Sequence, residues 1–233
     1  EGRHQDVVNK LNEITADTDG SLSKFANAHK YFGLNKSTRG GWVFREYAPN
    51  ATAITLVGTF SDWQEQDQYR LQNIGNGVWE IELEGADALK HGQFVKLMVG
   101  RQGNAFERLP AWITRCVLDE STMTLCGQIW QPDAPFEWTD GDFYGKRRPE
   151  APMIYEAHVG MAQEEPRVGT YREFADETLD WIKYAGYNTI QLMAIQEHPY
   201  YASFGYQVTN FFAPSYRYGT PEDLKYLINK AHG

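Results

Sequence analysis

The stretch from Tyr187 to Gly233, YNTIQLMAIQEHPYYASFGYQVTNFFAPSYRYGTPEDLKYLINKAHG, decides how this chain can fold. It holds a short apolar run, Thr189 to Ile195, then a long loop, and then a helical pattern that begins after Thr220. The apolar run carries no charge and has helical patterns on both sides, which predicts a strand of a parallel sheet covered on both faces. The loop comes after the carboxyl end of that strand, where α/β barrels place their active sites. The sequence therefore predicts a cleft at this loop.

The loop is rich in aromatic residues, namely Tyr200, Tyr201, Phe204, Tyr206, Phe211, Phe212, Tyr216 and Tyr218. Aromatic rings are what proteins set against the apolar faces of sugars. The alternative is that most of these rings pack the loop onto the sheet, because few residues of a binding surface carry its energy.

A second strand and helix are predicted just upstream. Met153 to Val159 has the pattern of a short strand, and Thr170 with Glu173 forms a capping box at the start of a helix. We expect the buried face of that helix to comprise Phe174, Thr178, Trp181, Ile182 and Ala185, with Gly186 just past its end. The last helix is expected to begin with Pro221 at its first position and to bury Leu224, Leu227, Ile228 and Ala231. Strand, helix, strand, helix predicts a parallel unit.

The region before this parallel unit has a different pattern of apolar and polar residues. Four segments alternate apolar and polar residues with period two, at residues 42–47, 53–58, 78–84 and 94–99. Turn signals separate them, among them the hairpin turn Gly75-Asn76-Gly77. Several short strands spaced in this way predict an immunoglobulin-like β-sandwich.

The predicted organisation is multi-domain, β plus α/β. A helical arm covers residues 1–32 and is expected to dock on the rest of the chain, through scattered apolar residues such as Val7, Leu11, Leu22 and Phe25. The β-sandwich covers 33–130, and a linker rich in Pro, Asp and charge covers 131–150. Residues 151–233 are expected to hold two βα units, as at the start of an incomplete (β/α)8 TIM barrel, which two units alone cannot close. We expect exposed apolar surface on this last part, and self-association.

Composition excludes several classes of protein. Of the 233 residues, 42% are hydrophobic and 23% are charged, which is typical of a soluble globular protein, and the net charge of -9 disfavours nucleic acid as a partner. No apolar run is long enough for a membrane helix, and the first residues lack the apolar core of a signal peptide, so we expect a cytoplasmic protein with no membrane partner. The two cysteines, Cys116 and Cys126, are expected to be buried free thiols. The chain begins without Met and stops where a helix ends, so we expect it to be part of something longer.

Two long blocks, YEAHVGMAQEEPRVGTYREFA at 155–175 and residues 187–225, resemble the 1,4-α-glucan branching enzymes nearly residue for residue. FREYAPNATAITLVGTFSDW at 44–63 and RLPAWITR at 108–115 resemble the family 48 carbohydrate-binding module that precedes the barrel in these enzymes. The sequence departs from the module's pattern at Tyr47, where a Trp is usual, and at residues 58–61.

The resemblance implies a chemistry, which is cleavage of an α-1,4 glucan and transfer of the cut chain to the 6-hydroxyl of another glucose. Retaining transfer of this kind needs a carboxylate nucleophile and a carboxylic acid about 5 to 5.5 Å apart. In this family the catalytic residues lie after later barrel strands, so we expect none of them before Gly233. Glu156 and Glu197 are then structural, and His158 and His198 are loop anchors. We expect no metal and no cofactor.

The resemblance also implies substrate-binding residues. At the cleft these are Tyr206, which would stack on the sugar at the cleavage subsite, with Gln207 and Asn210. In the module a remote glucan site would draw on Asp19, Tyr47, Pro49, Trp63, Asn76, Gly77 and Trp79. For Trp63 and Trp79 the alternative is that they fill the sandwich core.

The predicted function is therefore that of a glucan branching enzyme, with an α-1,4 glucan polymer and the remainder of the barrel as partners. Two alternatives remain open. One is a glucan-binding module without catalysis, and the other is a debranching-type relative that shares the module and the barrel.

Overall fold

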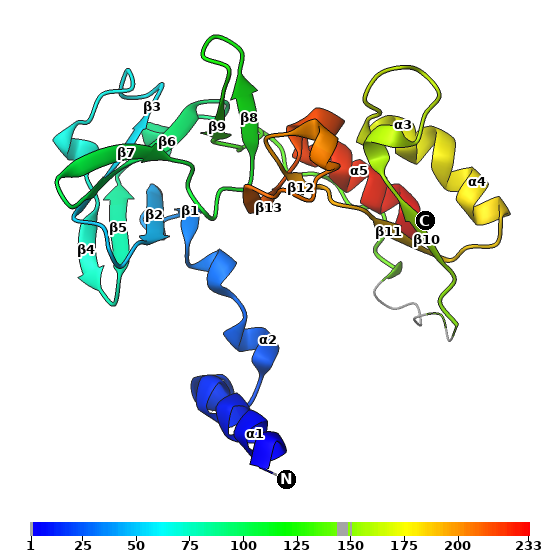
Figure 1. Ribbon diagram of the computed structural model, residues 1–233, viewed down its shortest axis with the longest axis horizontal. Coiled ribbons are helices and arrows are strands. Elements are labelled where there is room, and N and C mark those ends of the chain that lie inside the picture. The colour runs from blue at the N-terminus through cyan, green and yellow to red at the C-terminus, as the bar shows by residue number, and fades with distance from the viewer. Residues whose placement is uncertain (1, 144–148, 150) are drawn as a thin grey trace.

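The computed structural model describes residues 2–143, 149 and 151–233. Part of the predicted linker, residues 144–148 and 150, lies outside the described residues. The described chain forms three parts, which are an arm of short helices, a pair of antiparallel sheets and a small parallel unit (Figure 1).

Two sheets pack against each other as a sandwich. The first has the strand order β1-β2-β5-β4, with β1 Gly33–Lys36, β2 Trp42–Tyr47, β4 Gln72–Gly75 and β5 Val78–Leu83. The second has the order β3-β6-β9-β8, and β7 pairs with β6; its strands are β3 Ala53–Gly58, β6 Phe94–Arg101, β7 Asn104–Arg108, β8 Cys116–Asp119 and β9 Thr124–Gln128. All four strands predicted from alternation are present. One apolar core fills the space between the sheets, with Phe44, Ile54, Leu56 and Leu97 nearly inaccessible to solvent.

The turn that joins β4 to β5 shows why the sequence places a hairpin there. Gly75, Asn76 and Gly77 all have positive φ angles, of 100°, 52° and 78°. Only Gly, and Asn among the other residues, adopts this region readily. Both cysteines are buried and free, as predicted.

The parallel unit comes after the connector. Strands β10 Ile154–Ala157 and β11 Thr189–Leu192 are parallel, with Tyr155 opposite Ile190. The intervening helix comprises α3 Tyr171–Glu173, a π-helical segment Phe174–Thr178 and α4 Leu179–Tyr184. A short antiparallel pair, β12 Gln196–Glu197 and β13 Asn210–Pro214, lies between β11 and the final helix α5 Pro221–His232. The predicted capping box at Thr170 with Glu173 is present, and a second one is found at Thr220 with Asp223.

Two details of the predicted unit are wrong. The two strands are covered on one face only, because no further strand or helix of the described chain lies against the other face. The buried face of the middle helix also shifts, since the π-helical segment adds a residue to one turn. Leu179 is buried in place of Thr178, and Trp181 is 54% exposed.

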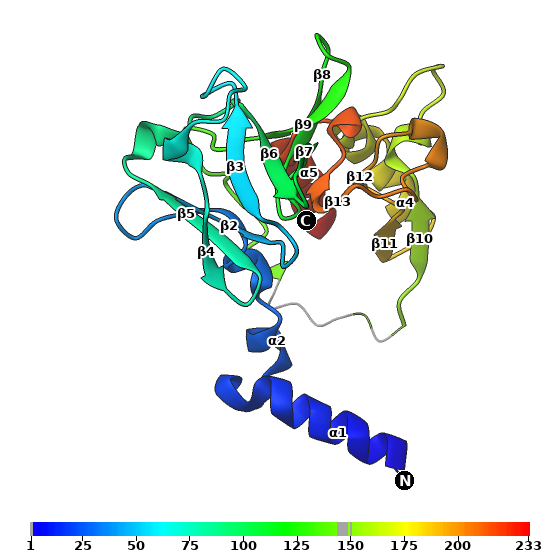
Figure 2. The ribbon, with the colours of Figure 1, turned by 60° about the vertical axis from the view of Figure 1, so that its left-hand side comes forward.

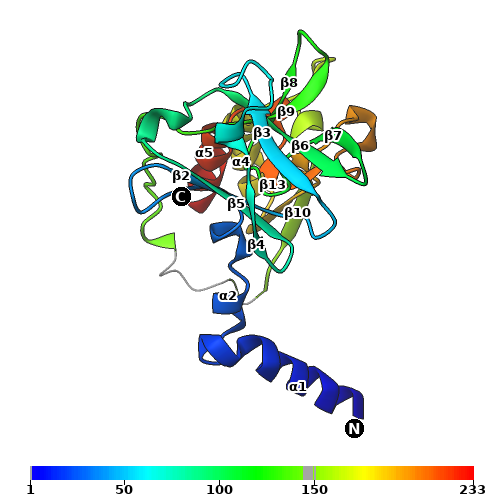
Figure 3. The same ribbon diagram turned by 90° about the vertical axis from the view of Figure 1, so that its left-hand side faces the viewer.

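The arm also differs from its prediction. Helices α1 Gly2–Thr15 and α2 Leu22–Phe25 project away from the sandwich in all three views (Figures 1, 2 and 3). Val7 is 67% exposed and Leu22 is 51% exposed, so the apolar residues of the arm do not dock on the rest of the described chain. Contact begins only at the base of the arm, where the guanidinium of Arg45 lies 4.3 Å from the ring centre of Tyr31.

No helix among the described residues is both long enough and apolar enough to cross a membrane.

Candidate functional site

The loop after β11 presents Tyr206 to solvent. Gly205 has φ of +85°, and a Cβ at this position would overlap the carbonyl oxygen of Ala194. The loop therefore folds back onto the end of the strand, and only Gly fits there. The amide of Tyr206 donates to the carbonyl oxygen of Ser203 at 3.0 Å, while its side chain is 69% exposed. The ring of Tyr206 is therefore exposed to solvent near the carboxyl end of β11.

Glu197 anchors the base of this loop. Its fully buried carboxylate accepts hydrogen bonds from the amides of His198 and Tyr216, at 3.0 and 2.9 Å, and from Nη1 of Arg217 at 3.1 Å. Burial raises the pKa of Glu197, and these donors oppose that rise. Glu197 is 0% exposed, so its carboxylate is closed to a sugar in this structure, which is consistent with the structural role expected for it.

Glu156 lies on the uncovered face of β10. Its Oε1 accepts a hydrogen bond from Nε2 of Gln191 at 3.0 Å, across the parallel pair. The two strands thus present a polar pair on the side that faces away from the helices.

His158 and His198, the two histidines at the carboxyl ends of the parallel unit's strands, are both buried. Nδ1 of His198 lies 3.0 Å from the carbonyl oxygen of Gln196, and Nε2 of His158 lies 3.5 Å from the hydroxyl of Tyr218. Burial lowers the pKa of His158. Over the part of the chain that the structure describes, no group of three or more His, Cys, Asp or Glu side chains is placed to hold a metal ion.

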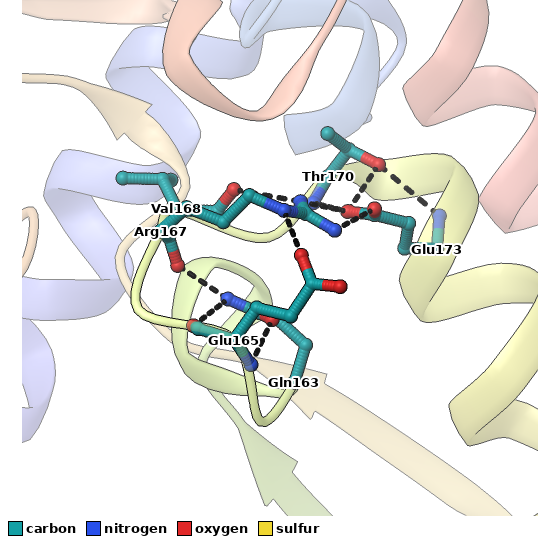
Figure 4. Close-up of polar contacts among 6 residues, drawn as sticks. All are labelled: Gln163, Glu165, Arg167, Val168, Thr170 and Glu173. Carbon is teal, nitrogen blue, oxygen red and sulfur yellow. Dashed lines mark hydrogen bonds and ion pairs between the residues drawn. The ribbon is translucent and has the colours of Figure 1, made fainter.

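Arg167 organises the loop after β10 (Figure 4). Its guanidinium pairs with Glu165 at 2.6 Å and with Glu173 at 2.6 Å, and the side chain of Gln163 closes the turn through the carbonyl oxygens of Glu165 and Arg167. The Arg167 guanidinium, with Thr170 of the capping box, lowers the pKa of Glu173 to about 2. This loop is therefore rigidly tied to the start of α3.

A shallow depression of about 400 Å³ lies between that loop and the loop of Tyr206. Its lining includes Met161, Arg167 and Tyr201. The hydroxyl of Tyr201 is within 3.4 Å of the carbonyl oxygen of Gly160, which joins the two loops at this point. The depression lies beside the carboxyl ends of the parallel strands, and Tyr201 of the aromatic loop lines it. Tyr206, Gln207 and Asn210 are not among its lining residues, so the cleft expected at Tyr206 stays a prediction.

The other two residues predicted at this cleft differ from each other. Gln207 is exposed next to Tyr206. Asn210 is buried, and its Nδ2 donates to the carbonyl oxygen of Pro110 in the sandwich at 3.0 Å. In this structure Asn210 contacts protein and is closed to a ligand, which corrects its predicted place in the cleft. The strand that carries it packs against the sandwich.

In the sandwich, part of the predicted glucan site comes together. The backbone of Gly77 lies so close to Pro49 and to the ring of Tyr47 that a Cβ would come within 3.0 Å of both. Asn76 continues this surface and is exposed, as is Tyr47 at 54%. Trp79 lies beneath, 6% exposed, with Nε1 donating to the carbonyl oxygen of Ala48 at 3.0 Å. Trp79 supports this surface from the core and offers no face to a sugar, which corrects its prediction as a platform.

Trp63 and Asp19 are placed elsewhere. Trp63 follows β3, which belongs to the second sheet, and it has φ of +59°. Its ring centre lies 5.5 Å from Nζ of Lys96. Asp19 lies in the arm, where it pairs with Lys24 at 3.1 Å. The prediction of one site drawing on both residues is therefore corrected: the surface that forms comprises Tyr47, Pro49, Asn76 and Gly77. We call this set the Tyr47 surface.

The sequence did not predict the seam between the sandwich and the parallel unit. Trp112, in the connection between β7 and β8, stacks on Phe212 of β13 with ring centres 4.3 Å apart. The side chain of Arg115 reaches the carbonyl oxygen of Gly219 at 3.3 Å and lies over Trp130, whose Nε1 donates to Glu222 at 2.6 Å. The only signal in the sequence is that Trp112 and Arg115 both lie in the block RLPAWITR, which forms a loop after Arg108.

Comparison with known proteins shows which families the chain resembles. Residues 31–113 match the family of carbohydrate-binding module 48, described as the isoamylase N-terminal domain. Over 93% of its length the chain is 47% identical to a 1,4-alpha-glucan-branching enzyme of Aspergillus oryzae, and over 99% it is 41% identical to one from Dictyostelium discoideum. Along nearly its whole length the chain is therefore similar to 1,4-alpha-glucan-branching enzymes.

The rice member of the branching-enzyme family, a chloroplastic/amyloplastic enzyme of Oryza sativa subsp. japonica, is 45% identical over 92% of the chain. The chain spans about a third of the length of these relatives, from 26% of the rice protein to 34% of the Dictyostelium protein. The similarity therefore runs continuously through the arm, the sandwich and the parallel unit.

Solved structures share the fold at lower identity. A putative alpha amylase from Salmonella typhimurium matches 88% of this chain with a TM-score of 0.69, and a pullulanase from Bacillus acidopullulyticus matches 86% with a TM-score of 0.65. Each is 20% identical, and this chain covers 31% and 28% of their lengths. These likenesses concern the fold alone.

Proposed function

We propose that this chain forms about a third of a working 1,4-alpha-glucan-branching enzyme, and that it binds α-1,4 glucan without supplying the catalytic carboxylates. The observation that carries the proposal is the continuous identity of 41 to 47% with enzymes of that name over at least 92% of the chain. The parallel unit would be the first two βα units of a TIM barrel, and the sandwich an immunoglobulin-like module. The domain limits remain those predicted, at 1–32, 33–130, 131–150 and 151–233.

Tyr206 is the residue of the cleft best placed to contact sugar. Its exposed ring lies near the carboxyl end of a parallel strand, on a loop held by the buried Glu197. In retaining transfer the sugar ring becomes flattened and cationic, and a π-face beside it stabilises positive charge. Gln207, exposed next to it, can donate and accept hydrogen bonds with sugar hydroxyls.

The Tyr47 surface is the second proposed contact. An exposed aromatic ring against Pro49 and a glycine turn is a flat, largely apolar surface on which a glucose ring can lie. One stacked ring contributes about 1 kcal/mol beyond its buried area, so binding here is weak and would hold a polymer by repeated contacts. The cytoplasmic location, and the absence of nucleic-acid and membrane partners, stay predictions from the sequence.

The proposal is tested on the full-length gene product with amylose as substrate. Branching lowers the iodine absorbance of amylose and creates α-1,6 linkages without a net gain of reducing ends. We expect this outcome, and we expect Tyr206→Ala to lower kcat/KM about tenfold or more, because loss of a desolvated cation–π contact costs up to about 2 kcal/mol. Tyr200→Ala, at a neighbouring ring that is 61% exposed, is the matched control.

Two results would contradict the proposal. Release of linear chains from a branched glucan would identify the debranching alternative. Branching activity from residues 1–233 alone would show that catalytic carboxylates are present in this chain, and Glu156 would then be the first candidate.

A further inference from the structure

Trp112 stacks with two aromatic rings from different parts of the molecule. Phe32, at the base of the arm, stacks on it with ring centres 5.4 Å apart and planes inclined by 21°. Phe212, in β13, stacks on it with ring centres 4.3 Å apart and planes inclined by 18°. The three rings are therefore a clamp between arm, sandwich and parallel unit.

The clamp acts on the strand that ends the Tyr206 loop. Phe212 lies six positions after Tyr206 in the sequence, and Asn210 of the same strand donates to the carbonyl oxygen of Pro110, two positions before Trp112. Ala213, 1% exposed, is part of the sandwich core. One end of the Tyr206 loop is thus fixed within the parallel unit by Glu197, and the other end is fixed by the sandwich.

The clamp is connected to the Tyr47 surface through a buried carboxylate. Glu46, 2% exposed, accepts a hydrogen bond from the amide of Ala111 at 2.9 Å and another from the amide of Tyr47 at 3.2 Å. The neighbour of Trp112 and the exposed Tyr47 are therefore held by the same side chain. Gly33 permits this packing, because a Cβ there would come within 2.9 Å of Trp112.

We propose that Trp112 is a positioning residue, through which the sandwich fixes the loop that carries Tyr206, and that Glu46 holds this clamp in register with the Tyr47 surface. The functional half of this inference rests on the proposed branching activity. Misplacing a contacting group by about 1 Å can cost up to about a hundredfold in rate. The sandwich then contributes to turnover as well as to binding.

The structural part of this inference, that Trp112 fixes the loop of Tyr206, is tested on this chain by amide hydrogen exchange. In Trp112→Leu, amides of residues 205–213 should exchange at least about tenfold faster, including that of Thr209, which donates to Glu197. Trp112→Phe, which retains a stacked ring, should restore most of the protection. Phe212→Leu removes the partner ring and should reproduce the effect if Trp112→Leu fails to fold. Trp138→Leu, at a 47% exposed tryptophan outside the clamp, is the control.

The functional half is tested in the full-length gene product with the same variants. We expect Trp112→Leu to lower kcat about tenfold with a smaller change in KM, and Trp112→Phe to recover most of it. Unchanged exchange in both Trp112→Leu and Phe212→Leu would overturn the clamp. Faster exchange with an unchanged kcat would overturn the positioning role. A wild-type protein without branching activity would overturn the proposed function, while the exchange data would still decide the clamp.

Discussion

The sandwich and the parallel unit bury their apolar residues in different ways. In the sandwich each sheet covers the inward face of the other, so that Phe44, Ile54 and Leu97 lose almost all contact with solvent. In the parallel unit the inward residues Tyr155 and Ala157 pack on helices, but Ile154 on the other face is 50% exposed. An antiparallel sandwich needs one partner sheet, whereas a pair of parallel strands needs cover on both faces. The difference is that the two sheets of the sandwich cover each other, whereas one face of the parallel pair is left exposed by the described residues.

The largest difference in stability is expected when one apolar side chain is removed from the sandwich and another from the parallel unit. Phe44→Ala should lower the free energy of unfolding of the sandwich by about 3 to 5 kcal/mol, because it removes buried area and leaves a cavity. Ile154→Ala should cost less than about 1 kcal/mol, since half of the side chain is already in water. Urea unfolding followed by tryptophan fluorescence measures both. Equal costs would show that the face of β10 is covered in solution.

A smaller effect is expected at the turn before Tyr206. Gly205→Ala should destabilise the loop by about 1 to 3 kcal/mol, because it combines a positive φ with an overlap on Ala194. Gly186→Ala is the matched control, since Gly186 has φ of +91° and open space around it. Limited proteolysis of residues 198–209 provides the measurement. Equal cleavage of the two variants would contradict the close approach of the loop to β11.

The exposed apolar side chains of the parallel unit predict that the chain self-associates, with no loss of its folding stability. Trp181 and Tyr184 of α4 are 54% and 91% exposed, and Ile154 of β10 in the same unit is 50% exposed. We expect the chain to bind an apolar dye and to sediment faster at higher concentration, and Trp181→Ser to reduce both. Met123→Ser, at a residue of the sandwich that is 70% exposed, should change neither. A monodisperse monomer without dye binding would show this prediction to be wrong.

The smallest expected effect concerns Glu173, whose pKa is lowered to about 2. A carboxyl group with a lowered pKa in the folded state contributes stability that is present above its unfolded pKa of about 4.3 and is lost as the pH falls through its folded pKa. Glu173→Gln should therefore reduce stability slightly at pH 7, and the difference from wild type should shrink between about pH 4.3 and 2. Carboxyl chemical shifts measured against pH report the pKa directly. A value near 4.3 would mean that Arg167 does not pair with Glu173 in solution.

Much of the fold was predictable because its causes are local. The alternation in Val78–Leu83, the glycine turn before it, and the capping boxes at Thr170 and Thr220 each specify their element through neighbouring residues. The parallel pairing of β10 and β11 was predictable from the order of the elements. The limits of the strands were less certain, since the apolar run to Ile195 ends its pairing at Leu192.

The candidate sites were predictable only in part. Of the residues that the resemblance implied, Tyr206 and Tyr47 are exposed, but Asn210 and Trp79 are buried. Sequence spacing says which face of a strand a residue occupies, and it does not say which other domain that face meets. The seam at Trp112 arises from packing between segments distant in sequence, which no local pattern encodes. The π-helical turn before Trp181 was likewise absent from the helical pattern of the sequence.

The central claim is that the sandwich binds glucan, and affinity electrophoresis of this chain tests it directly. In native gels that contain glycogen we expect the wild-type chain to migrate more slowly than in gels without it. Tyr47→Ala should abolish most of this retardation, while Tyr184→Ala, at the most exposed ring of the parallel unit, should retain it. A wild-type chain that glycogen does not retard, or a Tyr47→Ala variant that is retarded as strongly as wild type, would contradict the account.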